Sequence, residues 1–152
     1  MKHYLADIEK ETLANTDYRR VVYTGNYTQL VLMSIEPGDE IGTEVHGLDQ
    51  FIRAEKGAGK VILNGTDEHD LPADHAVIIP AGMQHNVINT GEEPLKLYSL
   101  YSLPEHKHGT VHARKADEQE EHFDGTTSHT ASCLKRKNPP NQSGLAGFYF
   151  YG

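Results

Sequence analysis

The apolar residues of this chain fall into short runs between residues 27 and 103. These runs are rich in β-forming side chains and occupy 27–35, 51–55, 60–63, 75–79, 87–88 and 95–103. Turn-forming residues separate them, and the pair Asn64-Gly65 is typical of a two-residue hairpin because both positions tolerate positive φ. Short strands with frequent turns and no long helical period predict an all-β sandwich or barrel.

The two ends of the chain have a different pattern. The first residues are polar, and a short helix is predicted over 7–13. After Pro104 the chain is polar and rich in histidine, a composition typical of a loose tail. Four adjacent aromatic residues at 148–151 are expected to anchor this tail, because exposing them to water costs free energy. The predicted organisation is an N-terminal extension (1–20), a barrel (21–103) and a C-terminal tail ordered by docking (104–152).

Two segments carry candidate metal ligands. In the segment 80–89, a Pro-x-Gly turn places His85 at the start of a strand, and alternation puts Asn89 on the same face. One inward histidine is more often a core residue than a ligand. However, Glu44 and His46 alternate on one face of an earlier strand, and Gln50 can face the same way. A carboxylate, two imidazoles and an amide oxygen from distant segments are what a metal site inside a small barrel requires.

These two segments resemble the two signature motifs of the cupin superfamily. In the first motif Gly38 and Gly57 keep the spacing, with Glu44, His46 and Gln50 in the His, His and Glu positions. In the second motif Pro80, Gly82, His85 and Asn89 match, and Asp74 replaces the first glycine. The resemblance covers about residues 20–103 and is closest to small single-domain cupins. It implies a double-stranded β-helix, that is a jelly-roll barrel, and a homodimer.

The candidate ligand set predicts one divalent ion bound by Glu44, His46 and His85, with Gln50 as a weaker fourth ligand. Two histidines and a carboxylate suit Zn, Fe, Mn or Ni, and ligand type does not choose among them. In the alternative, Glu44 and Gln50 hydrogen-bond each other in a metal-free barrel. An unpaired Glu44 inside the barrel would be costly, which favours a cation partner. Arg53 is predicted on the opposite face to Gln50.

Two further groups are candidates for chemistry. Tyr98 and Tyr101 have opposite parity on the last strand, so the inward one could donate a proton or bind substrate; an ordinary core residue is the alternative. We take Tyr101 and Glu44 as the catalytic candidates. His106 and His108 repeat the His-x-His spacing, but a solvated turn is predicted there rather than a second metal site or a lid histidine.

Composition excludes several classes of partner. A chain of 152 residues fits one domain, and its net charge of −8 disfavours nucleic acid and anionic membranes. No run is long and apolar enough for a membrane span, and the N-terminus lacks the apolar core of a signal peptide. The single Cys133 cannot form an internal disulfide, and the basic run 135–137 is expected to be solvated. A cytoplasmic location is therefore predicted.

The predicted function is a metal-dependent enzyme acting on a small polar molecule, such as a sugar or an oxygenated acid. An ion at this site could stabilise negative charge developing on a substrate oxygen, in isomerase, epimerase or dioxygenase chemistry. The alternative is a non-catalytic protein that binds a small ligand.

Overall fold

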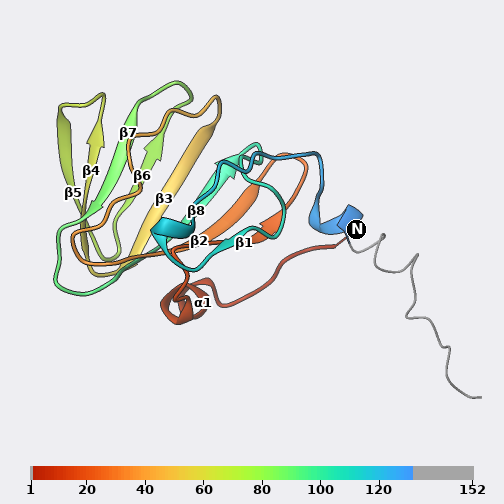
Figure 1. Ribbon diagram of the computed structural model, residues 1–152, viewed down its shortest axis with the longest axis horizontal. Coiled ribbons are helices and arrows are strands. Elements are labelled where there is room, and N and C mark those ends of the chain that lie inside the picture. Colours follow the sequence, from red (N-terminus) through yellow and green to blue (C-terminus); the bar gives the residue numbers. More distant parts are fainter. Residues whose placement is uncertain (1, 132–152) are drawn as a thin grey trace, which may run out of the picture.

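The computed structural model describes residues 2–131 (Figure 1). Three expectations lie outside the described residues: the aromatic anchor at 148–151, the solvated basic run at 135–137 and the state of Cys133. Within the described part, none of the helices is long and apolar enough to cross a membrane.

The described chain is built mainly of strands. Its elements are α1 (Ile8–Ala14), β1 (Arg19–Thr24), β2 (Gln29–Ile35), β3 (Asp49–Lys56), β4 (Ala58–Leu63), β5 (Asp67–Pro72), β6 (Ala76–Ile79), β7 (His85–Asn89), β8 (Leu95–Ser102), β9 (Val111–His112) and the 3-10 turn η1 (Lys115–Asp117). The apolar runs predicted as strands correspond to β2, β3, β4, β6, β7 and β8. The predicted helix is α1, whose first turn is capped by the Asp7 side chain.

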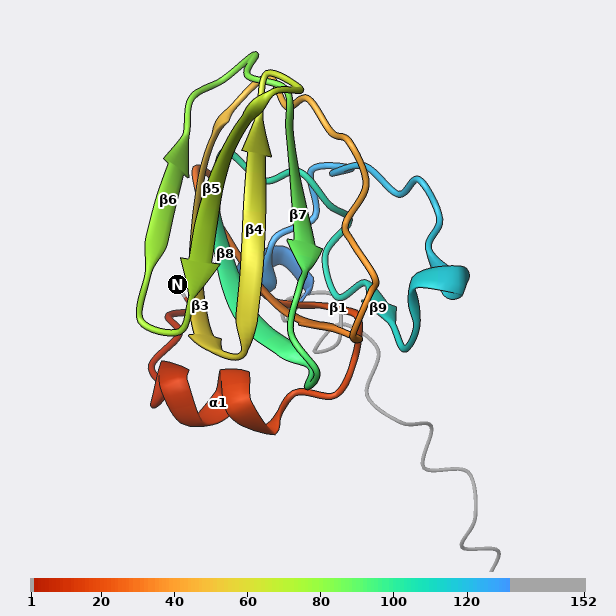
Figure 2. The same cartoon turned by 90° about the vertical axis from the view of Figure 1, so that its left-hand side faces the viewer.

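The strands form two antiparallel sheets, which confirms the predicted all-β jelly-roll barrel. One sheet has the order β6-β3-β8-β2-β1-β9, and the other has the order β5-β4-β7. The two sheets face each other, and α1 lies across one end of the barrel (Figures 1 and 2). Their inner faces meet in one apolar core that includes Val31, Ile52, Val61, Val87 and Leu97.

Strand alternation decides which side chains reach the barrel interior. On β3 Gln50 is buried, whereas Arg53 faces outward and pairs with Glu55 and Asp74. On β8 Tyr101 is buried, whereas Tyr98 is only partly covered on the outer face. Both assignments agree with the parity read from the sequence.

The structure confirms a hairpin at Asn64-Gly65 between β4 and β5, but Leu63 pairs with Asp67, so the loop has three residues, 64–66, rather than the predicted two. Asn64 and Gly65 have positive φ, 50° and 78°, as the tight turn requires. Sequence patterning did not predict β5, because its first four residues, 67–70, are polar and exposed. They form a strand because they pair along the edge of β4, and the burial of Leu71 ties its end to the core.

Residues 105–122, called the crossing segment below, return to the barrel after β8. Its strand β9 pairs with β1, where Arg19 lies opposite His112. Figure 2 shows the crossing segment beside β1, on the side of the molecule away from β6. An isolated antiparallel β-bridge pairs His106 with His122, so the two ends of the crossing segment lie side by side.

Candidate metal centre

Glu44, His46 and His85 come together at one end of the barrel. Their ligand atoms lie within 4.8 Å of one another. The backbones of Glu44 and His85 exchange two hydrogen bonds, of 2.9 and 3.0 Å, which join the loop between β2 and β3 to the start of β7. Glu44 makes only this isolated bridge, so the strand predicted around it is absent from the described structure.

His85 is held in the form that suits a metal ligand. Its Nδ1 lies 3.1 Å from the carbonyl oxygen of Met83. Because a carbonyl only accepts, Nδ1 carries the proton and the lone pair is on Nε2. That Nε2 is buried and has no hydrogen-bond partner within residues 2–131. Burial also lowers the pKa of His85, which keeps the ring neutral.

His46 lies between two carboxylates. Its Nε2 is 3.1 Å from Oε2 of Glu44, and its Nδ1 is 3.6 Å from Oε1 of Glu105 in the crossing segment. The ring of His46 also packs against that of His85, with centroids 5.2 Å apart. These contacts fix the orientation of His46 from three sides.

Gln50 presents an oxygen rather than a proton to the interior. Its Nε2 donates to the hydroxyl of Ser99 at 2.9 Å. Its Oε1 is buried and has no hydrogen-bond partner in the described part of the chain. The amide nitrogen thus donates to Ser99, and no hydrogen bond joins Gln50 to Glu44 in the described chain, whereas the metal-free alternative required one.

Arg19 is a buried cation that sequence reasoning did not identify as part of the site. Only 4% of its side chain is exposed, and it lies 3.5 Å from Oε1 of Glu44 and 2.5 Å from Oε1 of Glu118. Burial alone would raise the pKa of the Glu44 carboxyl. The hydrogen bond with His46 and the charge of Arg19 outweigh this and hold the pKa below its usual value.

Tyr101 and His106 pack behind the candidate ligands. Tyr101 is 1% exposed, and its ring meets those of His46 and His106 edge-on, at 5.6 and 5.1 Å. Burial raises the pKa of Tyr101 well above its usual value, so the phenol stays protonated. Burial also lowers the pKa of His106 to about 3, and its Nε2 has no hydrogen-bond partner among the described residues.

The predicted solvated turn is therefore wrong for His106. The side-chain oxygen of Gln29, at the start of β2, accepts hydrogen bonds from the backbone N–H groups of Glu105 and His106. This fixes the chain just after β8 and turns the His106 ring into the barrel, where it is 9% exposed. His108 is only partly buried and lies 3.1 Å from the hydroxyl of Thr24.

A cleft of about 540 Å³ opens over this centre. The barrel contributes Arg19, Glu44 and His46 to its wall, and the crossing segment contributes Glu105, His106, Lys115 and 118–122. This volume lies in the range of about 300–1,000 Å³ that is usual for small-molecule sites. Glu44 and His46 are thus open to a small molecule on the side of the crossing segment, whereas Gln50 and His85 do not line this cleft.

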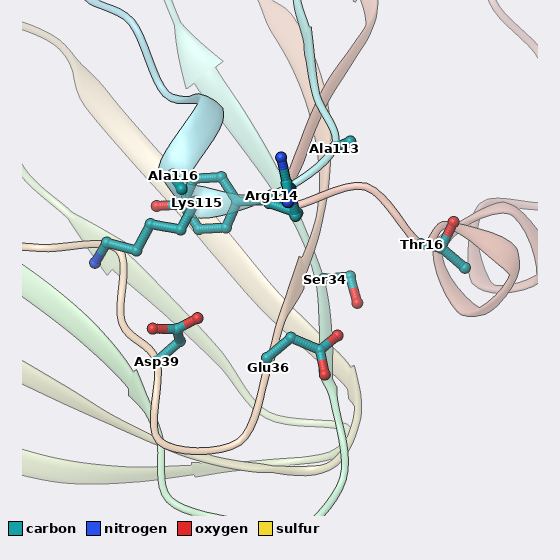
Figure 3. Close-up of a pocket in the computed structure, with 9 residues that line it drawn as sticks. Thr16, Ser34, Glu36, Asp39, Ala113, Arg114, Lys115 and Ala116 are labelled. Atoms are coloured by element: carbon teal, nitrogen blue, oxygen red, sulfur yellow. The ribbon is translucent and has the colours of Figure 1, made fainter.

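A second pocket, of about 640 Å³, lies on the other side of η1. Figure 3 shows Glu36 and Asp39 on one side of it and residues 113–116 on the other. The guanidinium of Arg114 is held by Asp117, at 3.1 Å. We place the functional site in the cleft over Glu44, because that cleft leads to the grouped ligand atoms.

Known proteins similar to this chain point to one family. Residues 31–101 match the family model of the cupin domain. The uncharacterized protein YrkC of Bacillus subtilis is 43% identical over 122 residues, which are 76% of this chain and 66% of YrkC. The uncharacterized protein L612 of Acanthamoeba polyphaga mimivirus is 40% identical over 116 residues, which are 74% of this chain and 72% of L612.

A solved structure agrees with these relatives. The crystal structure of BH2720 from Bacillus halodurans has 47% sequence identity and a TM-score of 0.75, and the match covers 76% of this chain and 92% of that one. The motif residues, the jelly-roll barrel and these similarities lead to the same conclusion: the chain belongs to the cupin superfamily.

Proposed function

We propose that this protein binds one divalent metal ion through Glu44, His46 and His85, with Gln50 as a fourth ligand, and that it is an enzyme acting on a small polar molecule. One observation carries the proposal. Nε2 of His85 and Oε1 of Gln50 are both buried lone-pair atoms without a hydrogen-bond partner in residues 2–131. Buried polar atoms are rarely left unpaired, and a cation is a partner that lone-pair atoms can share.

Arg19 offers a metal-free explanation for only part of the site. Its guanidinium compensates the charge of Glu44. It is itself a donor with no lone pair, and no hydrogen bond joins it to Gln50 or to His85 within the described chain. Arg19, its partners Glu44 and Glu118, and the His46 partner Glu105 together carry a net charge of −2, which a divalent ion would neutralise.

The chemistry follows from the residues that face the cleft. When bound, a divalent ion would supply Lewis acidity to a substrate oxygen and stabilise the charge that develops there. Glu44 is the carboxylate of the proposed ligand set, and it lines the cleft, so it could move a proton. Tyr101 is a protonated phenol packed against His46, so it can orient that ring and could donate a proton. A redox-inert ion favours isomerase or epimerase chemistry, and Fe or Ni favours dioxygenase chemistry.

Metal analysis tests the proposal directly. Protein purified without chelator is analysed for metal, and the stripped protein is then titrated separately with Zn, Mn, Ni and Fe(II). We expect one ion per chain for at least one of these metals. No binding of any of the four would contradict the metal site and leave a metal-free binding barrel.

A non-catalytic ligand-binding protein is the second candidate. The contacts of Arg19 with both Glu44 and Glu118 favour it, because they restrain the carboxylate that catalysis would have to move. The substitution Glu44→Gln separates the two. In an enzyme it abolishes turnover even where ligand still binds, whereas in a binding protein it changes only affinity.

A homodimer and a cytoplasmic location remain predictions. The outer face of the larger sheet supports pairing between copies. Phe51 is the cross-strand neighbour of Ile78 and Leu100 there, and Ile78 is 70% exposed. Sedimentation velocity over a range of concentrations tests the dimer, and a monomer at every concentration would contradict it.

A further inference from the structure

The wall of the cleft is strongly acidic. Five carboxylates line it, from Glu44, Glu105, Glu118, Glu120 and Glu121. Two permanent cations, Arg19 and Lys115, line it as well. With histidines neutral the lining carries a net charge of −3, and one divalent ion at the proposed centre would leave −1.

Both cations already contact oxygen atoms of the protein. Arg19 is 4% exposed and lies within 3.5 Å of Glu44 and 2.5 Å of Glu118. The ammonium of Lys115 donates to the backbone carbonyl of Glu40. A ligand carboxylate or phosphate at Arg19 would therefore compete with Glu44 and Glu118, inside a wall that already carries excess negative charge.

Two lining residues carry a buried nitrogen without a hydrogen-bond partner in the described chain, Arg19 at Nε and His106 at Nε2, and only that of His106 belongs to an uncharged ring. His106 is 9% exposed, lines the cleft, and has a buried Nε2 without a hydrogen-bond partner in the described chain. Its low pKa keeps the ring neutral, so this nitrogen can exchange one hydrogen bond with a hydroxyl group. A hydroxyl both donates and accepts, whereas a carboxylate only accepts.

From the charge of this wall and the unpaired nitrogen of His106 we infer that the ligand is a neutral polyhydroxyl compound, a sugar or polyol, and not a carboxylate or phosphate. This inference rests on the proposed metal centre. A hydroxyl or carbonyl oxygen of the ligand faces the metal ligands, and a further hydroxyl pairs with His106. A cationic amine fits less well, because the bound ion would repel it from the base of the cleft.

Co(II)-loaded protein and three five-carbon probes test this inference. D-ribose, D-ribonate and D-ribose 5-phosphate are titrated separately, and the visible spectrum of Co(II) and ligand-detected NMR report binding. We expect ribose to bind with a dissociation constant at least about 10-fold lower than either anion. Raising the salt concentration should narrow this difference, because screening weakens the repulsion of the anions.

A matched pair of variants tests the role of charge. Glu120→Gln removes one carboxylate from the cleft and should strengthen binding of the anions about 2-fold, with a smaller effect on ribose. Glu68→Gln removes a carboxylate from the β5 edge and should change neither. His106→Phe should weaken ribose binding while Co(II) still binds.

Each outcome has one meaning. Failure of Co(II) to bind contradicts the proposed metal centre itself. With Co(II) bound, either anion binding as tightly as ribose, or no probe binding at all, overturns the inference about the ligand. Tight ribonate binding that Arg19→Met abolishes would show that the ligand carboxylate takes the place of Glu118.

Discussion

The two walls of the site differ in how the fold holds them. The barrel wall carries Glu44, His46, Gln50 and His85, and the paired backbones of Glu44 and His85 and the strand β3 fix it. The outer wall is made by Arg19 and the crossing segment, which meet through one ion pair and a two-residue strand pairing. The barrel wall therefore supplies fixed ligand atoms, and the outer wall supplies the charged groups around them.

Removing Arg19 should have the largest effect on stability. Arg19→Met leaves Glu44 and Glu118 partly buried without their cation, and we expect the free energy of unfolding to fall by about 3–5 kcal/mol. Arg20→Met is the control, because Arg20 is about half exposed and its loss should cost about 0.5 kcal/mol or less. Urea unfolding measures both.

Adding a divalent metal ion to the Arg19→Met protein gives a second test of the role of Arg19. A divalent ion next to Glu44 replaces part of the lost positive charge, so the Arg19→Met protein should regain stability with metal more than the wild type does. A loss below about 1 kcal/mol in the metal-free protein would mean that the outer wall contributes little to holding the site.

Removing His85 should greatly weaken metal binding while leaving the outer wall intact. His85→Ala deletes one of three proposed strong ligands, and we expect metal affinity to fall by about 100-fold or more. His75→Ala is a matched control, because His75 makes the same Nδ1 contact with the carbonyl two residues earlier but is exposed. Isothermal titration with Zn measures both, and unchanged affinity in His85→Ala would contradict the proposed ligand set.

Asn89 belongs to the same motif as His85 but has a structural role. Its side chain donates to the carbonyls of Ile35 and Glu93 and accepts from the backbone N–H of Gly91. Asn89→Ala should reduce the free energy of unfolding by about 1–3 kcal/mol, because it leaves buried backbone groups unpaired. One ion per chain should still bind, and loss of metal from the folded variant would show that Asn89 supports the centre itself.

The barrel wall could be predicted from sequence because its signals are local. Alternation on β3 and β8 is strict, so Gln50 faces inward and Arg53 outward as expected, and only one of Tyr98 and Tyr101, here Tyr101, faces inward. The Pro-x-Gly turn before His85 also identifies His85 as the residue at which its strand begins. Such signals depend only on neighbouring residues and on the twofold period of a strand.

The outer wall could not be predicted in this way. Arg19 and Arg20 are adjacent in a strand, and only the pairing of β1 with β2 and β9 decides that Arg19 is the buried one. The burial of His106 depends on Gln29, 77 residues earlier, which accepts its backbone N–H. A polar, histidine-rich composition is typical of a loose tail, and tertiary contacts outweigh it here.

Glu105 lies where the two walls meet, and replacing it should have the smallest of the expected effects, a modest loss of metal affinity. Its Oε1 lies 3.6 Å from Nδ1 of His46 and 3.5 Å from Nδ1 of His122. When a metal ion takes the place of the hydrogen bond between Nε2 and Glu44, a carboxylate on this side of His46 favours a proton on Nδ1 and so leaves the Nε2 lone pair for the metal. Glu105→Gln should therefore weaken metal binding about 10-fold, at the low end of what outer-shell substitutions cost.

The matched variants decide whether Glu105 acts through His46 or only through packing. Glu105→Asp keeps the charge and should recover part of the lost affinity, whereas Glu121→Gln removes another carboxylate of the crossing segment and should leave it nearly unchanged. Co(II) spectra of the variants report the ligand field directly. Equal affinity in Glu105→Gln and the wild type would mean that the crossing segment shapes the cleft without tuning the centre, and that the barrel wall alone determines metal binding.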